Sequence, residues 1–425
     1  MTPEQRTAQT YRYEKWRALS SGVLETAGTT FLLLIAVRWF HAGNLAKALV
    51  ATGASVGLLL APVVVSQVER WQWPTARAAS WIARLGAASF VVMALVPTLP
   101  VFVAGAVVGL ACSSALVPLM TQVYQDNYPA TRRGLLFSRT VMVRIAAAAV
   151  FGELAGTLLS VSGEGAWHAR LFTGGMEHFR WLLVAFAAAH ALAACALLRV
   201  PSRALTITGG AHPFKALRYV RHDRVFRMTL ISWMFLGFGN LMMVPLRVEY
   251  LANAKYGVTL NGAVLSAGAI ALLTSVLPNL ARLALNPLWG WLFDRMNFFV
   301  MRITLNLGFM LGILAFFTTG SFWGLIAGAV FYGVSIAGGD VAWSLWVTKF
   351  APPERVADYM AVHTFFTGLR GAIAPVVAFQ AAGVLSLNTL GWISAALVLF
   401  GTLLLVPEIR HGQRGRPAPD LAEEI

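Results

Sequence analysis

A few ionisable residues lie deep inside long apolar stretches of the sequence. They are Glu25, Arg144, Asp340, His363 and Arg370. Moving a charge from water into an apolar medium is costly, so a charged side chain in such a stretch must face protein, an opposite charge or trapped water. Groups of this kind can bind a polar solute or carry a proton, and we consider both kinds of chemistry for them.

The spacing of these residues places several of them on shared helix faces. His363, Thr367 and Arg370 follow one another at i, i+4 and i+7, which makes one stripe along a helix. Asp340 follows two glycines that loosen a helix, and Trp343 lies on the same face one turn later. A loosened helix beside an acid suits a moving gate or a binding site.

The charge of each residue suggests its role. We predict that the acids Glu25 and Asp340 carry protons or contact a cation, because loading such a site can require a buried carboxylate to change its charge. The basic members are predicted to contact an anionic or polar part of a solute. With two polar neighbours and one aromatic neighbour added, the predicted pathway for solute and protons is Glu25, Arg144, Asn240, Asp340, Trp343, His363, Thr367 and Arg370.

The stretches that carry these residues have the length and composition of membrane-spanning helices. The chain has 425 residues, of which 58% are hydrophobic and 12% charged, against the roughly 25% charged residues of a soluble domain. Twelve apolar runs are mostly about 20 residues or longer, enough to cross a hydrocarbon core of roughly 30 Å as a helix. The predicted spans are residues 19–40, 46–66, 78–96, 101–124, 135–160, 179–198, 225–248, 259–285, 298–318, 322–347, 356–385 and 389–406.

The net charge of +15 reports topology rather than nucleic-acid binding. With an even number of spans both termini lie on one side, and that side carries most of the 33 Lys and Arg residues. This asymmetry predicts that both termini are cytoplasmic. The first 18 residues are polar and the first apolar run is too long for a signal core, so we expect a multi-pass protein of the cell inner (plasma) membrane.

The sequence repeats itself once, which indicates two similar halves. Residues 61–77 align with residues 286–302, and the apolar runs around them align as well. The matched pairs are Pro62 with Pro287, Glu69 with Asp294, Arg70 with Arg295, and Arg77 with Arg302. A polar link that recurs once per half between apolar runs is typical of a duplicated membrane transporter.

The second copy resembles a known family signature. Gly290-Trp-Leu-Phe-Asp294-Arg295, followed by Arg302, is similar to the loop Gly-x-Leu-x-Asp-Arg-x-Gly-Arg of the major facilitator superfamily. That loop joins spans two and three and recurs between spans eight and nine. The first copy departs further, with Val65 for the glycine and Glu69 for the aspartate.

The resemblance implies an all-α membrane protein with twelve transmembrane helices in two six-helix bundles, which is the major facilitator fold. It also implies that the loop residues support gating and do not bind the solute. The residues concerned are Pro62, Glu69, Arg70, Arg77, Pro287, Gly290, Asp294, Arg295 and Arg302.

The same interpretation divides the chain into five parts. We expect a cytoplasmic tail over residues 1–18, an N-terminal bundle over 19–198, a cytoplasmic linker over 199–224, a C-terminal bundle over 225–406 and a cytoplasmic tail over 407–425. The basic linker is predicted to hold a short amphipathic helix over residues 213–222 that lies on the membrane surface.

The predicted function is secondary active transport of a small polar or charged organic solute by alternating access, coupled to protons. Direction of transport, and symport against antiport, stay open. A drug-type efflux antiporter is an alternative, although span five has Phe151-Gly152-Glu153 where many such proteins have a Gly-Pro pair. If Glu25 pairs with Arg144 and Asp340 with Arg370 in a dry core, a receptor or assembly factor that moves no solute becomes the better interpretation.

Other classes of protein are disfavoured. The sequence has no zinc-ligand spacing, no P-loop and no credible catalytic triad, so we predict no enzyme activity, no cofactor and no metal. The expected partners are a small-molecule substrate, protons and the lipid bilayer, with no nucleic acid. We expect a monomer.

Overall fold

The structure is a computed structural model of the 425-residue chain. It describes residues 1–129, 132–160, 175–204, 218–260, 262–350 and 356–411. Helices dominate these ranges. A short hairpin pairs β1 (Thr259–Leu260) with β2 (Ala263–Val264) in antiparallel register.

The N-terminal bundle consists of six spanning segments. In the first, α1 (Pro3–Thr26) continues through a π turn, η1 (Ala27–Phe31), into α2 (Leu32–Arg38). The others are α3 (Asn44–Trp71), α4 (Thr75–Leu95), α5 (Leu99–Ala115) with α6 (Val117–Asn127), α7 (Arg133–Leu159), and η3 (Met176–His178) with α8 (Phe179–Leu198).

The C-terminal bundle repeats this architecture after a short helix, α9 (Arg218–His222). Its eighth span also contains a π turn: α11 (Ala267–Ala271), η6 (Leu272–Val276) and α12 (Leu277–Arg295) follow without a break. The remaining helices are α10 (Arg224–Ala252), η5 (Ala254–Tyr256), α13 (Phe298–Thr318), α14 (Phe322–Leu345), α15 (Val347–Phe350), α16 (Val356–Ala381), α17 (Leu387–Leu403) and η8 (Val406–His411).

Twelve helical segments of the described chain are long and apolar enough to cross a membrane, which confirms the predicted fold class. Two predicted spans, the first and the eighth, differ from the structure in their limits. The helix of the first span begins at Pro3, within the polar segment expected to be a tail. Thr2 and Gln5 form a capping box that starts the helix there. The amphipathic helix predicted over residues 213–222 is described only as α9, and its first part lies outside the described residues.

The eighth span, predicted over residues 259–285, is wrong at both ends. Residues 259–264 form the hairpin, and the helix starts at Ala267, where Ser266 Oγ accepts a hydrogen bond of 3.0 Å from the amide of Ala269. The apolar span then continues to Phe293. The depth of each residue along this span therefore differs from the depth that the predicted limits imply.

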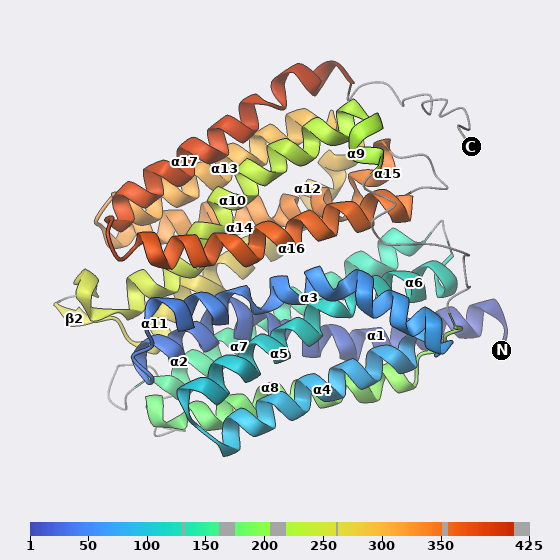
Figure 1. The fold of residues 1–425 in the computed structure, drawn as a ribbon, viewed down its shortest axis with the longest axis horizontal. Helices are drawn as coiled ribbons and strands as arrows, with labels where there is room; N and C mark the ends of the chain where they lie inside the picture. The colour runs from blue at the N-terminus through green and yellow to red at the C-terminus, as the bar shows by residue number, and fades with distance from the viewer. Residues whose placement is uncertain (130–131, 161–174, 205–217, 261, 351–355, 412–425) are drawn as a thin grey trace.

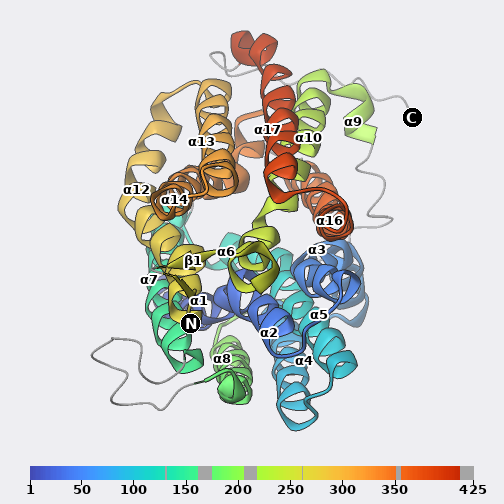
Figure 2. The ribbon, with the colours of Figure 1, turned by 90° about the vertical axis from the view of Figure 1, so that its left-hand side faces the viewer.

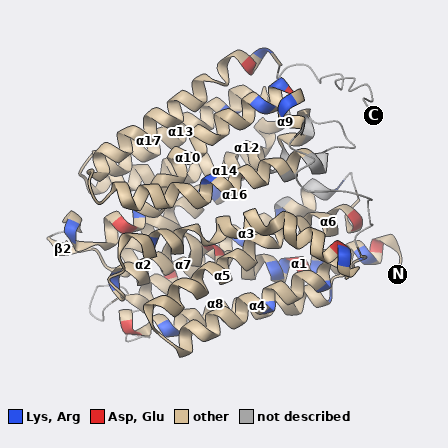
Figure 3. Ribbon diagram, in the orientation of Figure 1, with Lys and Arg blue, Asp and Glu red and all other residues tan. Residues whose placement is uncertain are grey.

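The two bundles lie one above the other, and Figure 1 shows the N-terminus and the short helix α9 on the right. We call this side the terminal end, and the opposite side, where α2 ends and the hairpin lies, the distal end. Figure 2 looks from the distal end and shows the helices of the N-terminal bundle below those of the C-terminal bundle. Most of the described Lys, Arg, Asp and Glu residues lie near the two ends, with few along the middle (Figure 3).

The bundles contact each other through α1 to α3 and α7 on one side and α10 to α12 and α16 on the other. Close approach is possible because small residues face one another: a Cβ on Gly156 of α7 would come within 2.7 Å of the Cβ of Ala271. Hydrogen bonds that join described residues of the two bundles occur at Glu25 and from there toward the distal end.

A buried ion pair joins the bundles near the distal end. Lys47 Nζ, at the start of α3, donates to Glu249 Oε1, near the end of α10, at 2.7 Å. The two residues are 3% and 1% exposed. Next to them, Arg38 donates to the carbonyl oxygens of Ala252 at 3.1 Å and Leu265 at 2.6 Å. We call this group the distal latch.

Candidate functional site

A chain of ion pairs crosses the boundary between the bundles, within the segments that are long and apolar enough to span a membrane. Arg282 of α12 donates from Nε to Asp340 Oδ2 at 2.6 Å, and from Nη1 to Glu25 Oε1. Arg144 Nε lies 3.3 Å from the other carboxylate oxygen of Glu25. Asn279 Oδ1 also accepts from Arg282 at 3.3 Å. We call these five residues the central network.

The central network balances its charges. Two carboxylates face two guanidinium groups, so the fixed charge sums to zero, and Arg282 holds an acid from each bundle. Arg282 itself is buried, with 6% of its side chain exposed, whereas Glu25, Asp340 and Arg144 are 24%, 29% and 32% exposed. The acids are therefore paired and yet still accessible, which suits groups that bind or release a ligand.

Four helices, two from each bundle, position these side chains. Glu25 stands directly before the π turn η1, and Arg282 follows the π turn η6 in the same span. The two π turns contact each other, and the hydroxyls of Thr30 and Thr274 hydrogen-bond across them at 3.0 Å. A π turn adds a residue to one helical turn and is common at functional sites, because it redirects the side chains around it.

The distance between Glu25 and Arg144 is set by close packing of α1 on α7. A Cβ on Gly22, one turn before Glu25, would overlap with the carbonyl oxygen of Arg144 and come within 2.7 Å of the Cβ of Ala147. Only glycine allows this approach. Gly22 thus brings an acid and a base of the same bundle into contact.

Sequence reasoning missed Arg282 as a member of the site. With the eighth span predicted to end at residue 285, Arg282 looked close to the inner surface. In the structure the span ends at Phe293, which places Arg282 roughly 16 Å inside it. The signal was Asn279 and Arg282 at i and i+3, two strongly polar residues on one face of an apolar helix.

The stripe of His363, Thr367 and Arg370 lies elsewhere. His363 is fully buried in the C-terminal bundle, where its ring lies 4.7 Å from that of Trp233 and 5.3 Å from that of Trp343. Arg370 donates to Thr367 Oγ1 at 3.1 Å. The considered pairing of Asp340 with Arg370 is wrong, because the structure pairs Asp340 with Arg282.

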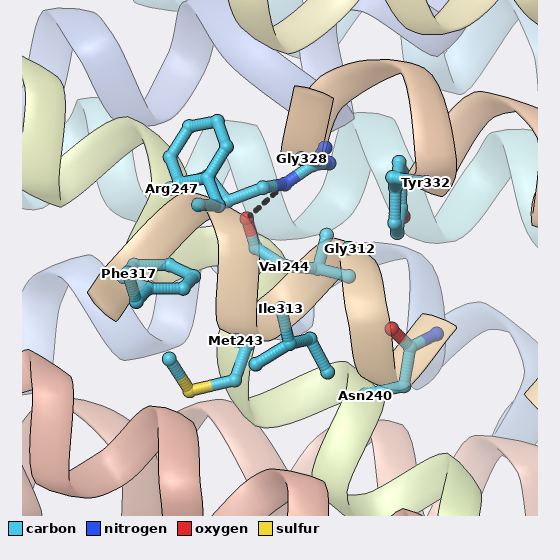
Figure 4. Close-up of a pocket in the computed structure, with 10 residues that line it drawn as sticks. Asn240, Met243, Val244, Arg247, Gly312, Ile313, Phe317, Gly328 and Tyr332 are labelled. Carbon is cyan, nitrogen blue, oxygen red and sulfur yellow. Dashed lines mark hydrogen bonds between the residues drawn. The ribbon is translucent and has the colours of Figure 1, made fainter. Parts of the chain in front are cut away.

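Asn240 lies in a third place, a small cavity within the C-terminal bundle. The cavity, of about 10 Å³, has room for the centre of one water molecule. Figure 4 shows Asn240 and Arg247 of α10 with Tyr332 of α14 around it. The guanidinium carbon of Arg247 lies 3.7 Å from the centre of the Tyr332 ring, and Asn240 Oδ1 has no hydrogen-bond partner among the described residues.

The predicted gating residues of the two halves differ in their surroundings. Pro62 and Pro287 lie inside α3 and α12, and a Cβ on Gly290 would meet no described atom within 4 Å. Arg70, Arg77 and Arg295 are exposed, and the guanidinium of Arg295 lies 4.5 Å from the ring centre of Trp291.

Arg302, the counterpart of exposed Arg77, is only 6% exposed and lies over Trp233. Glu69, near the end of α3, is partly buried. The side chain of Asp294 lies outside the described residues. The gating role of these loops stays a prediction.

Comparisons with known proteins agree with this architecture. Residues 265–422 match the family model of the Major Facilitator Superfamily. No curated protein matched the chain. Solved structures with a similar fold include the nucleoside transporter NupG (12% identity, TM-score 0.68, covering 95% of this chain and 98% of that one).

Two further structures are similar to the same extent. The D-xylose-proton symporter has 16% identity and a TM-score of 0.63, covering 97% of this chain and 98% of that one. The human organic anion transporter MFSD10 has 15% identity and a TM-score of 0.64, covering 95% of this chain and 100% of that one. At such identities the likeness shows the fold alone.

Twelve helical segments that are long and apolar enough to cross a membrane, arranged in two six-helix bundles, define a multi-pass membrane protein. The match to the Major Facilitator Superfamily model covers residues 265–422 of the C-terminal half, and the fold of the whole chain is similar to that of the solved structures.

Proposed function

We propose that the protein is a secondary active transporter that moves a small polar or charged organic solute by alternating access and couples this movement to protons. The observation that carries the proposal is the Glu25–Arg282 ion pair, which joins the two bundles within segments that are long and apolar enough to span a membrane. The titles of the similar structures, which name a nucleoside transporter, a D-xylose-proton symporter and an organic anion transporter, are consistent with a solute of this class.

The distribution of contacts supports a state that is closed at the distal end. The distal latch and the Ser160–Gly268 hydrogen bond of 2.8 Å lie on that side of the central network. The terminal end carries the basic start of α1 and the basic helix α9, and we therefore propose that this side, with both termini, faces the cytoplasm at a cell inner (plasma) membrane. The solute would then reach Glu25, Asp340 and Arg144 from the cytoplasmic side.

The shared arginine supplies a physical reason for coupling. Glu25 and Arg282 belong to different bundles, so a rocking motion that opens the distal end must separate them. Separation leaves a carboxylate and a guanidinium without partners, which is strongly unfavourable. A proton on Glu25 would neutralise the unpaired carboxylate, and a polar group of the solute would pair with Arg282. Because both are needed to remove the cost of separation, movement of the proton and movement of the solute are coupled.

The test is transport in proteoliposomes with a pH-sensitive dye inside. We expect a nucleoside, a pentose or an organic anion from a screening panel to cause proton movement with the wild-type protein, and Glu25→Gln to lower this at least tenfold. Glu153→Gln, which removes an acid of α7 outside the central network, is the matched control. Proton movement that is equal in wild type and Glu25→Gln would refute the coupling role of this residue.

The complete pairing of the four central charges favours a second candidate, a receptor or assembly factor that moves no solute. The two candidates differ in ligand response. A transporter is expected to show a raised unfolding midpoint with at least one solute of the panel, because a ligand that binds the folded state stabilises it. No stabilisation and no flux across the whole panel, with the protein correctly folded, would favour the second candidate. Flux of cationic drugs out of vesicles would instead indicate the efflux antiporter.

A further inference from the structure

Two of the buried arginines of the C-terminal bundle that pair with no acid among the described residues belong to one cluster. Arg302 of α13 and Arg370 of α16 are each 6% exposed. No ion pair joins either residue to a carboxylate within the described part of the chain. Both lie near His363: Arg370 follows it two turns later on α16, and the guanidinium of Arg302 lies over Trp233, whose ring is 4.7 Å from the His363 ring. Burying two like charges in one cluster is costly, so a group of opposite charge is expected with them.

Unpartnered hydrogen-bond donors surround the same place. His363 has no exposed surface, and neither of its ring nitrogens has a partner among the described residues. Guanidinium and indole N–H groups can only donate. The buried donor atoms without a described partner here are Arg302 Nε, Arg370 Nε and Nη1, Trp233 Nε1 and Trp346 Nε1. A ligand that satisfies them must accept hydrogen bonds.

Aromatic rings wall this group off from solvent. The guanidinium carbon of Arg302 lies 4.4 Å from the ring centre of Trp233. The His363 ring stands edge-on to Trp233 at 4.7 Å and to Trp346 at 5.4 Å. Arg370 packs closely on α10, where a Cβ on Gly237 would come within 2.9 Å of its guanidinium carbon. In such a dry setting each charge interaction is stronger than in water.

We infer that Arg302, Arg370 and His363, walled by Trp233 and Trp346, form an anion-binding site that is separate from the central network. The central network neutralises its own arginines, whereas this cluster carries an uncompensated positive charge. Its ligand is a small anion, either the carboxylate group of an organic solute or a free inorganic ion. The inference rests on the proposed function only for the first of these sources, because binding itself can be measured without transport.

Binding is tested with the purified full-length protein in detergent. Thermal unfolding is followed in sodium gluconate, whose anion is bulky, while chloride, sulfate, acetate or lactate replaces it at constant ionic strength. We expect a saturable rise of the midpoint of about 2 °C at ten times the dissociation constant. A response to chloride or sulfate assigns a free inorganic ion, and a response to acetate and lactate alone assigns the carboxylate of a solute.

Variants separate binding from packing. Arg302→Gln and Arg370→Gln should abolish the anion response and, in gluconate, should unfold at the same temperature as wild type or higher, because each removes an unpaired buried charge. Arg84→Gln is the matched control, since Arg84 also lies over a tryptophan, Trp81, at 4.5 Å, but is exposed on α4. It should keep the full response.

A second measurement guards against variants that fold poorly. Iodide quenches tryptophan fluorescence on contact, so wild type should show a saturable component of quenching that competing chloride or acetate removes and that Trp233→Phe reduces. The inference is overturned if no anion raises the midpoint of wild type, or if Arg302→Gln loses the same stability with and without anion, as a packing role requires. Both results are independent of any failure to transport.

Discussion

Arg282 is the residue on which the central network depends. It is the member that contacts acids of both bundles, Glu25 in α1 and Asp340 in α14, and it is the least exposed of the charged members. Arg144 can still pair with Glu25 when Arg282 is gone, but Asp340 then keeps no cation that the described residues supply. Loss of Arg282 would therefore leave Asp340 without a cation and would remove the ion pair that joins the bundles at Glu25.

This asymmetry gives a prediction for stability. Arg282→Gln should lower the free energy of unfolding by roughly 3 kcal/mol, the low end of the range for breaking a buried pair, because the acids are partly exposed. The double variant Arg282→Gln with Asp340→Asn should recover much of this loss, since it leaves no unpaired charge at residue 340. Chemical denaturation of the four proteins of the cycle measures the coupling. Additive losses would show that the Arg282–Asp340 pair does not matter for stability.

At the same scale, single residues could be found from the sequence more easily than their partners. Glu25, Arg144 and Asp340 stand out because each is a charge inside an apolar run, and the structure brings all three together. Which arginine meets which acid depends on the rotation and depth of two helices from different bundles. No spacing within one helix contains that information, so the sequence suggested Arg370 rather than Arg282 as a partner for Asp340.

At the scale of helices, glycine and π turns place the charges. Gly22 allows α1 to touch α7, and the π turns η1 and η6 shift the side chains that follow them. The span count was predictable from hydrophobicity, and the repeat from the matched Pro, acidic and Arg positions of the two polar links. The π turns were not, since an extra residue in one helical turn changes no apolar pattern. The eighth span was misplaced because apolar residues of the hairpin, such as Leu260 and Val264, look like the start of a helix.

The role of Gly22 can be tested directly. Gly22→Ala should push α1 away from α7, weaken the Glu25–Arg144 ion pair and cost roughly 1–3 kcal/mol of stability, as overpacking does. Gly28→Ala is the control on the same span, because its nearest neighbour is the flexible end of the Leu110 side chain at 3.2 Å. Thermal unfolding and the proton-movement assay report the two effects. Equal behaviour of the two variants would mean that close packing of α1 on α7 is not needed.

The distal latch gives a second prediction for helices. Lys47→Met should leave Glu249 without its closest cation and destabilise the closed distal end, so that the bundles separate there more often. Spin labels at Thr98 and Thr319, exposed on the distal loops of the two bundles, should then show a larger share of long distances. Lys255→Met is the matched control, since Lys255 lies 3.9 Å from the same acid but is 44% exposed. An unchanged distance distribution in Lys47→Met would show that the latch does not hold the distal end.

At the scale of the whole molecule, the two halves share a fold but differ in charge. The repeat places Arg77 and Arg302 at equivalent positions, yet Arg77 is exposed and Arg302 is buried over Trp233. The N-terminal bundle brings Glu25 and Arg144 to the boundary, whereas the C-terminal bundle brings Arg282 with Asp340 and has further buried arginines, namely Arg247, Arg302 and Arg370. The repeat thus accounts for the shared fold of the two halves, whereas the charged residues inside the two bundles differ.

A disulfide between the two bundles can block their relative motion at the distal end. Ser160 Oγ lies 3.1 Å from the Cβ position of Gly268 across the bundles, and the Cβ of Ser160 is farther than 3.8 Å from it, close to the separation that a disulfide needs. Ser160→Cys with Gly268→Cys, in a Cys195→Ser background because Cys195 is exposed, should therefore cross-link under oxidation with the distal end closed.

Alternating access requires the distal end to open, so the cross-linked protein should lose solute flux almost completely and regain it on reduction, while it still binds solute. Each single cysteine variant should transport normally under both conditions. Transport that continues at the wild-type rate in the cross-linked protein would contradict a rocking motion of the two bundles around the central network.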